Sequence, residues 1–256
     1  MANLTLSGKV AIVTGASRGL GEGIAYELAK RGAKVTVNFT SASSQARADA
    51  LVERIASLNN GSAAASVRAD LRLPESPAII LDATLAAFST STIDILVNNA
   101  GVEQHRQLTD VTLDDFVAVF DVNVRGALLM TRAVLPHLRA PGRIINVSSL
   151  GARKGWAGYT VYCASKAALE GFTRALAVEI GGAGHSVNAV APGPTESDML
   201  DTLSAEVIEA QKQRTPMQNR IGTVDDIAQI VAWLAEESSR WVTGQTISAN
   251  GGAEMI

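Results

Sequence analysis

The stretch that decides the fold runs from Val10 to Gly21 and reads Val-Ala-Ile-Val-Thr-Gly-Ala-Ser-Arg-Gly-Leu-Gly. Its first four residues are all apolar, which is typical of a strand that is covered on both faces. Three glycines follow with the spacing G-x-x-x-G-x-G, and a helix-like stretch at 19–31 overlaps the last two. A strand, a glycine turn and a helix in this order predict the first unit of a parallel sheet.

The same alternation continues along the chain. Strands are expected at 10–14, 34–39, 62–69, 93–97, 143–147, 187–190 and 245–248, and helices at 19–31, 46–58, 78–88, 114–138, 162–180 and 223–235. The pattern predicts an α/β fold: a single-domain, Rossmann-like, doubly wound parallel sheet of about seven strands with helices on both faces. The domain is expected to span 1–256, with no linker inside it.

One segment, 193–222, breaks the alternation because it is long and polar and has only one modest helix pattern, at 197–213. We interpret it as a substrate lid, with an ordinary surface insertion as the alternative.

Composition limits the possible functions. The chain has 256 residues, of which 47% are hydrophobic and 18% charged, and a net charge of −3. Disorder is therefore not expected, and scattered basic residues argue against a nucleic-acid surface. The single cysteine, Cys163, and three histidines without ligand spacing predict neither an internal disulfide nor a metal site. No secretory leader or membrane-spanning run is visible, so we expect a soluble cytoplasmic protein.

The glycine turn has a direct physical use. Gly15, Gly19 and Gly21 let the backbone approach a pyrophosphate closely, and the amide groups that begin the helix favour an anion. A tight strand–helix turn without a ligand is the alternative, but the turn's position after the first strand is the context that a dinucleotide site needs.

Three motifs together resemble the short-chain dehydrogenase/reductase family. They are Thr14–Gly21, the Asn-Asn-Ala-Gly stretch at 98–101, and the Tyr-Cys-Ala-Ser-Lys stretch at 162–166. The resemblance runs from about Leu6 to about Gly252 and is greatest to the 3-oxoacyl-carrier-protein reductase and ketoreductase-like branch. It implies hydride transfer between a nicotinamide cofactor and a carbonyl or alcohol.

The second strand bears on which cofactor is used. An acidic residue at its end usually binds the ribose of NAD, but residues 37–41 read Val-Asn-Phe-Thr-Ser and contain no carboxylate. Arg18 can pair with the 2′-phosphate of NADP, and Thr40 and Ser41 add hydroxyl donors. We therefore expect NADPH rather than NADH. An Arg18 that only points into solvent is the alternative.

The resemblance also implies contacts at the ends of later strands. Asp70, with Leu71, would hold the adenine ring, unless it only caps a turn. Asn98 would lie along the cofactor or brace the sheet, and the turn after 187–191 would hold the nicotinamide carboxamide. The expected cofactor residues are Gly15, Ser17, Arg18, Gly19, Leu20, Gly21, Asn38, Thr40, Ser41, Asp70, Leu71, Asn98, Ala100, Gly101, Tyr162, Lys166, Pro192, Gly193, Thr195 and Ser197.

Tyr162 is the expected proton carrier. Lys166 lies four residues later, on the same face of the expected helix, where its charge should lower the pKa of the phenol. Ser149 precedes Tyr162 by 13 residues (162 − 149), the family's spacing for the serine that holds the substrate oxygen. Ser148 is expected to be structural. Tyr159 is not expected to be the proton carrier, because the residue four positions later is Cys163 and not a lysine.

Asn123 lies between apolar residues in the middle of an expected helix, which is an unfavourable place for asparagine. The resemblance makes it the fourth catalytic residue, bracing a water that relays protons to the lysine. A buried asparagine at a helix distortion is the alternative, and both can hold together.

The substrate itself is not named by the sequence. Its wall is expected from 102–107, 150–160 and 193–222, and the basic pair Arg153-Lys154 suits an acidic or phosphopantetheine-linked substrate or is simply solvated. An NADPH-dependent reductase of ketones or 3-oxoacyl groups is favoured over an NAD(P)-dependent secondary-alcohol dehydrogenase and over a non-catalytic cofactor-binding sensor or scaffold. The family resemblance implies a homotetramer or homodimer and a small-molecule substrate, with no nucleic-acid or membrane partner.

Overall fold

The chain folds around one parallel sheet in a computed structural model that describes residues 4–196 and 204–255. The sheet has seven strands in the order β3-β2-β1-β4-β5-β6-β7. The strands are β1 Val10–Val13, β2 Lys34–Phe39, β3 Ala63–Arg68, β4 Ile93–Asn98, β5 Leu138–Val147, β6 Ser186–Pro192 and β7 Thr246–Ala249. The order reverses direction between β1 and β4, so the crevice at their carboxyl ends is where such sheets bind ligands. The predicted fold class is confirmed.

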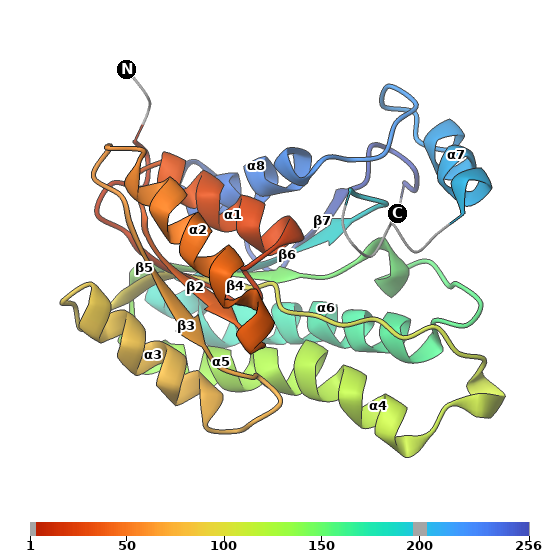
Figure 1. The fold of residues 1–256 in the computed structure, drawn as a ribbon, viewed down its shortest axis with the longest axis horizontal. Helices are drawn as coiled ribbons and strands as arrows, with labels where there is room; N and C mark the ends of the chain where they lie inside the picture. Colours follow the sequence, from red (N-terminus) through yellow and green to blue (C-terminus); the bar gives the residue numbers. More distant parts are fainter. Residues whose placement is uncertain (1–3, 197–203, 256) are drawn as a thin grey trace.

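Two helical layers cover the sheet (Figure 1). One face carries α1 Gly19–Lys30, α2 Gln45–Ala56 and α8 Val224–Ala235; the other carries α3 Ser76–Ala87, α4 Leu113–Phe120, α5 Ala127–Val134 and α6 Thr160–Ile180. A further helix, α7 Ala205–Gln213, stands apart from both layers, at the upper right of the view in Figure 1. None of the helices in the described ranges is both long and apolar enough to cross a membrane.

Alternate residues of β1 explain why its sequence is continuously apolar. Ala11 and Val13 belong to the core cluster under α1 and α8, whereas Val10 and Ile12 belong to the cluster on the opposite face. Both sets are buried because helices cover both sides of the sheet. The period-two pattern of a half-exposed strand is therefore absent here.

The helix expected at 114–138 is present from Leu113 to His137, but it is not a regular α-helix throughout. It is divided into α4, a π-helical turn at Asp121–Gly126, α5 and a short 3₁₀ turn at Leu135–His137. A Cβ on Gly126 would lie 3.0 Å from the Cβ of Leu71, so the π turn brings this segment close to the loop after β3. The following strand, β5, begins at Leu138 instead of residue 143.

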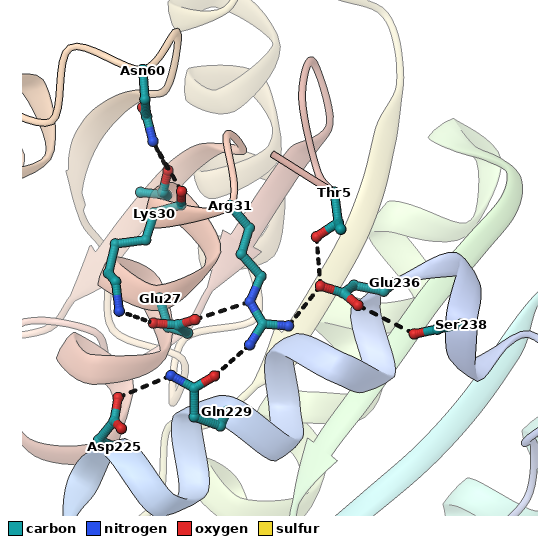
Figure 2. A network of polar contacts seen from close by, with 10 residues as sticks. Thr5, Glu27, Lys30, Arg31, Asn60, Asp225, Gln229, Glu236 and Ser238 are labelled. Carbon is teal, nitrogen blue, oxygen red and sulfur yellow. Dashed lines mark hydrogen bonds and ion pairs between the residues drawn. The ribbon is translucent and has the colours of Figure 1, made fainter. Parts of the chain in front are cut away.

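A polar network ties α1, which follows the glycine turn, to α8 (Figure 2). The Arg31 guanidinium donates to Glu27 at 2.9 Å, to Gln229 at 2.5 Å and to Glu236 at 2.6 Å. Glu236 also accepts from Thr5 at 2.5 Å, which fixes the segment before β1. Since the bonds converge from three segments, they orient the first helix against the sheet.

Candidate active site

The glycine turn has the geometry that a close ligand approach requires. Gly15 and Gly19 have φ of 62° and 55°, in the left-handed region that favours glycine. A Cβ on Gly15 would lie 2.9 Å from the Cα of Ala100, and one on Gly21 would lie 2.3 Å from the carbonyl oxygen of Gly15. Ser17 is buried at the turn, and Leu20 is half-buried in the first turn of α1. The backbone therefore occupies space that side chains would fill.

Two asparagines brace this turn through hydrogen bonds to its backbone. The Asn99 amide donates to the carbonyls of Thr14 at 2.8 Å and Gly15 at 3.1 Å. Asn38 accepts from the Gly15 amide at 3.3 Å and donates to the Ala69 carbonyl at 3.1 Å. Asn38 was expected among the cofactor contacts, but its side chain is buried and engaged with backbone. Asn99 was not singled out from the sequence; its place beside Asn98 was the available signal.

The end expected to bind the adenosine lies at the carboxyl ends of three neighbouring strands. Arg18 follows β1, and Thr40 and Ser41 follow β2; all three are exposed. Asp70 follows β3 and holds Arg72 through a bond of 2.9 Å from Nε and one of 2.5 Å from Nη2, and these hydrogen bonds keep the pKa of Asp70 below its usual value. Asp70 also accepts from the Arg72 amide at 3.0 Å, so the capping role exists beside any adenine contact.

The four expected catalytic residues come together beyond β5 and along α6. Ser149 follows β5, and Tyr162 and Lys166 lie on α6, one helical turn apart. All three are buried, and Asn123, in the π turn, is fully buried. Ser149 lies close enough to the Tyr162 phenol to lower its pKa, so the two groups that would flank a carbonyl oxygen are neighbours.

The pKa of Tyr162 differs from the sequence-based expectation. Burial raises it to about 12, and the hydrogen bond from Ser149 opposes this increase only in part. The Lys166 Nζ lies 5.9 Å from the centre of the phenol ring and donates to the Val147 carbonyl at 2.9 Å, so its charge does not offset the effect of burial. Burial lowers the pKa of Lys166 itself to about 8. The phenol is therefore held protonated at neutral pH.

Asn123 links the two sides of the site. Its amide oxygen accepts from the Val102 amide at 2.8 Å, and its nitrogen donates to the Val102 carbonyl at 2.9 Å and to the Ser165 hydroxyl at 2.9 Å. A Cβ on Gly101 would lie 3.1 Å from Lys166 Nζ and 3.4 Å from Asn123 Oδ1, so both groups lie against this glycine. Asn123 occupies a helix distortion, as one interpretation expected, and its catalytic role stays a prediction.

The side chain of Asn98 braces the sheet, which was the alternative to a cofactor contact. Its amide nitrogen donates to Thr131 at 3.0 Å and to Asn146 at 2.9 Å, inside the core. Leu71 is likewise buried, against the π turn.

The end expected to bind the nicotinamide is formed by the turn after β6. A Cβ on Gly193 would lie 2.7 Å from the Cβ of Asn250, so only glycine fits. The Thr195 hydroxyl donates to the Gly193 carbonyl at 2.9 Å, and Thr195 bridges to Gly222. Ser197, also expected here, lies outside the described residues, as do the first residues of the helix expected at 197–213; α7 begins at Ala205.

A buried carboxylate connects the loop after β5, which carries Ser149, to α6. It was not singled out from the sequence. Glu170, one turn beyond Lys166, accepts from Arg153 at 2.9 Å and from Ser148 at 3.3 Å. Ser148 also donates to the Lys166 carbonyl at 3.3 Å, which supports its expected structural role. An acidic residue on the core face of a helix was the available signal.

A row of aromatic rings leads outward from Tyr162. The centre of the Tyr159 ring lies 6.3 Å from that of Tyr162, 6.0 Å from that of Trp156 and 4.9 Å from that of His105. These residues come from the loops after β4 and β5, two of the three segments expected to form the substrate wall.

The glycines expected to lie along a nicotinamide dinucleotide occupy tightly packed turns. Glycines stand where a Cβ would collide with backbone or side chains at positions 15, 21 and 193, and the residues flanking this path are buried and braced. This glycine-lined path follows the carboxyl ends of β1, β4 and β6, where a dinucleotide binds in open α/β sheets.

Comparisons with known proteins agree with this geometry. The family model described as "Enoyl-(Acyl carrier protein) reductase" matches residues 15–254. The short-chain dehydrogenase/reductase FrzI of Cladobotryum sp is 45% identical, over 98% of each chain, and the versicolorin reductase stcU of Emericella nidulans is 40% identical, over 98% of this chain and 97% of its own. The solved structure of the angucycline C-6 ketoreductase LanV with bound NADP has a TM-score of 0.90 and 34% identity, and covers 97% of this chain and 96% of its own. The chain therefore belongs to the short-chain dehydrogenase/reductase family.

Proposed function

We propose that the protein is an NADPH-dependent carbonyl reductase that converts a ketone or 3-oxoacyl group into a secondary alcohol. The observation that carries the proposal is the convergence of Ser149, Tyr162, Lys166 and Asn123 on one buried site. A purely structural site would have no use for a buried phenol paired with a serine hydroxyl beside a buried lysine.

The residues divide the reaction between them. Bound NADPH supplies a hydride to the carbonyl carbon. The Ser149 hydroxyl holds the carbonyl oxygen, and the Tyr162 phenol gives its proton to that oxygen as negative charge develops there. Lys166, charged below its pKa of about 8, stabilises the phenolate that remains, and Asn123 keeps the loop at Val102 beside the lysine. The product is an alcohol, and the proton returns to Tyr162 from solvent.

Arg18 supports NADPH as the cofactor. It is exposed in the glycine turn, and residues 37–41, at the end of β2, contain no carboxylate. We expect Arg18→Ala to raise the KM for NADPH by about tenfold and to leave the KM for NADH nearly unchanged, because only NADPH carries a 2′-phosphate. Steady-state kinetics with both cofactors checks this, with Arg47→Ala on α2 as a matched surface control. An equal loss with both cofactors would contradict the assignment.

Among carbonyl compounds, the structure favours ring ketones over acidic or phosphopantetheine-linked substrates. The Tyr159 ring lies beside Tyr162 and contacts the rings of Trp156 and His105, which together form an aromatic surface. The basic pair expected to attract an anion is already occupied, since Arg153 pairs with Glu170 and Lys154 with Glu254. The relatives' names, versicolorin reductase and angucycline ketoreductase, point in the same direction.

A substrate screen tests the proposal. Purified protein is mixed with NADPH and with aliphatic ketones, bicyclic ring ketones and 3-oxoacyl thioesters, and NADPH absorbance is followed. We expect turnover to be fastest with the ring ketones. Turnover only with alcohols and NADP⁺ would favour the dehydrogenase alternative. Cofactor binding without turnover of any compound would favour the sensor alternative.

We also propose a homotetramer, with a homodimer as the smaller alternative, in the cytoplasm. Exposed apolar side chains support the assembly: Phe116 and Leu128 on α4 and α5, Val178 on α6, and Trp241 before β7. The free Cys163 fits a reducing compartment. Light scattering that gives a monomer mass would remove the assembly.

A further inference from the structure

A small cavity lies beside the catalytic loop, on the side of α7. Its volume is about 110 Å³, and its lining includes Leu150, Lys154 and Trp156 from the loop after β5, Arg214 after α7, and Glu254. Leu150 directly follows Ser149, and Trp156 belongs to the aromatic row. The cavity therefore lies next to residues of the expected substrate wall.

The charges in this cavity are already paired within the chain. The Glu254 carboxylate contacts Lys154 Nζ and lies 4.0 Å from Arg214 Nη2. The side chains of Lys154 and Glu254 are both 28% exposed, so the pair is partly removed from water. Two cations that would otherwise attract an anion thus face a carboxylate of the protein itself.

The segment that carries Glu254 is held in place. The Asn250 amide donates to the Glu254 carbonyl at 2.9 Å, and Asn250 Oδ1 accepts from the Gly252 amide at 2.9 Å. Asn250 packs against Gly193, in the turn expected to hold the nicotinamide, and Met217 donates its amide to the Gly251 carbonyl at 2.9 Å. Glu254 is therefore positioned by the same residues that frame the active site.

We propose that Lys154 and Arg214 form an anion-binding site that Glu254 fills as an internal ligand, so that the pocket selects neutral substrates and excludes carboxylate-bearing ones. The inference rests on the proposed carbonyl reduction and names its substrate class. A carboxylated substrate would have to displace Glu254 and leave that charge partly buried without a partner, which is costly. A neutral ring ketone meets no such cost.

Binding of two unreactive bicyclic probes tests this without turnover. The affinities of 2-naphthoate and 2-naphthol are measured by calorimetry on the NADP⁺-loaded protein, at a pH where naphthol is neutral. We expect Glu254→Gln to bind 2-naphthoate about tenfold more tightly than the unmodified protein and 2-naphthol equally well. Glu254→Ala, a second variant, should show the same contrast.

The double variant Glu254→Gln with Lys154→Gln tests whether Lys154 is the group that binds the naphthoate carboxylate. The gain in naphthoate affinity should disappear there, since the cation that binds the carboxylate is gone. An unchanged naphthoate affinity in both Glu254 variants, or a gain that survives loss of Lys154, overturns the proposal. The absence of ketone turnover in the screen described above would instead defeat the proposed function, while the binding contrast would still report on Glu254.

Discussion

The two sides of the active site are built in different ways. On the cofactor side, glycines and buried asparagines shape the backbone of a turn between β1 and α1, and few side chains face outward. On the substrate side, half-buried rings and ion pairs from the loop after β5, from the end of α7 and from the last residues form the wall. The first side depends on close backbone packing, and the second on side chains that can be exchanged singly.

This contrast suggests how the family keeps one reaction and varies its substrates. A change in the braced turn disturbs backbone that several strands share, whereas a change of Trp156 or Glu254 alters only the wall. The proposed catalytic residues stand between the two regions, just after β5, on α6 and in the π turn. Substitutions in each region should therefore affect different kinetic parameters, and the predictions below go from the largest effect to the smallest.

The largest effect on turnover is expected at Tyr162. Tyr162→Phe removes the proton donor but keeps the ring, so kcat should fall by about a thousandfold or more while NADPH still binds. Turnover assays and a fluorescence titration of NADPH measure the two effects. Tyr159→Phe, which keeps its ring in the aromatic row, is the matched control and should remain active. Near-normal turnover of Tyr162→Phe would refute the assignment.

The braced turn should respond through cofactor affinity. Gly21→Ala places a Cβ 2.3 Å from the Gly15 carbonyl and 2.5 Å from the Asn99 amide nitrogen. We expect the Kd for NADPH to rise by about a hundredfold, because overpacking displaces the backbone of the turn. Gly171→Ala on α6 has no atom within 4 Å of the new Cβ and should be nearly neutral. Equal NADPH affinities of the two variants would break the contrast between the regions.

We expect Glu170, which joins α6 to the loop after β5, to act as a positioning residue. Glu170→Gln removes the charge that pairs with Arg153 while keeping the shape, so the loop with Ser149 should lose its alignment with α6. We expect kcat to fall by about tenfold with the KM for NADPH unchanged. Glu179→Gln, exposed on the same helix, is the control. A loss of thermal stability with unchanged kcat would show a merely structural role.

The smallest effect concerns pH. Lys166, with a pKa lowered to about 8 by burial, loses its charge as pH rises, whereas Tyr162, with a pKa of about 12, stays protonated. The kcat/KM for NADPH, which reports the free enzyme, should be flat below pH 7 and fall by about fivefold between pH 8 and pH 9. Lys166→Arg, which stays charged, should remove that decline. A decline that persists in this variant would implicate another group.

Particular residues show how far the sequence could lead. The continuously apolar 10–13 and the glycines after it predicted strand, turn and helix correctly, because their spacing is set by local geometry. The spacing of Tyr162 and Lys166 placed both on one helix. The pKa of Tyr162 was predicted in the wrong direction, because it depends on burial and on where Lys166 Nζ points, and neither is a property of spacing.

The sequence by itself determined the order of strands and helices, since these follow from periodicity. The resemblance of its short motifs to a known family implied the path for a dinucleotide and the proposed proton carrier with its neighbours. Only the tertiary structure decided that a π turn at Asn123 interrupts the regular helix, and that Arg153 and Lys154 pair with Glu170 and Glu254. Those contacts join residues 17 and 100 positions apart, and long-range pairs of this kind depend on how the elements pack, which local pattern does not contain.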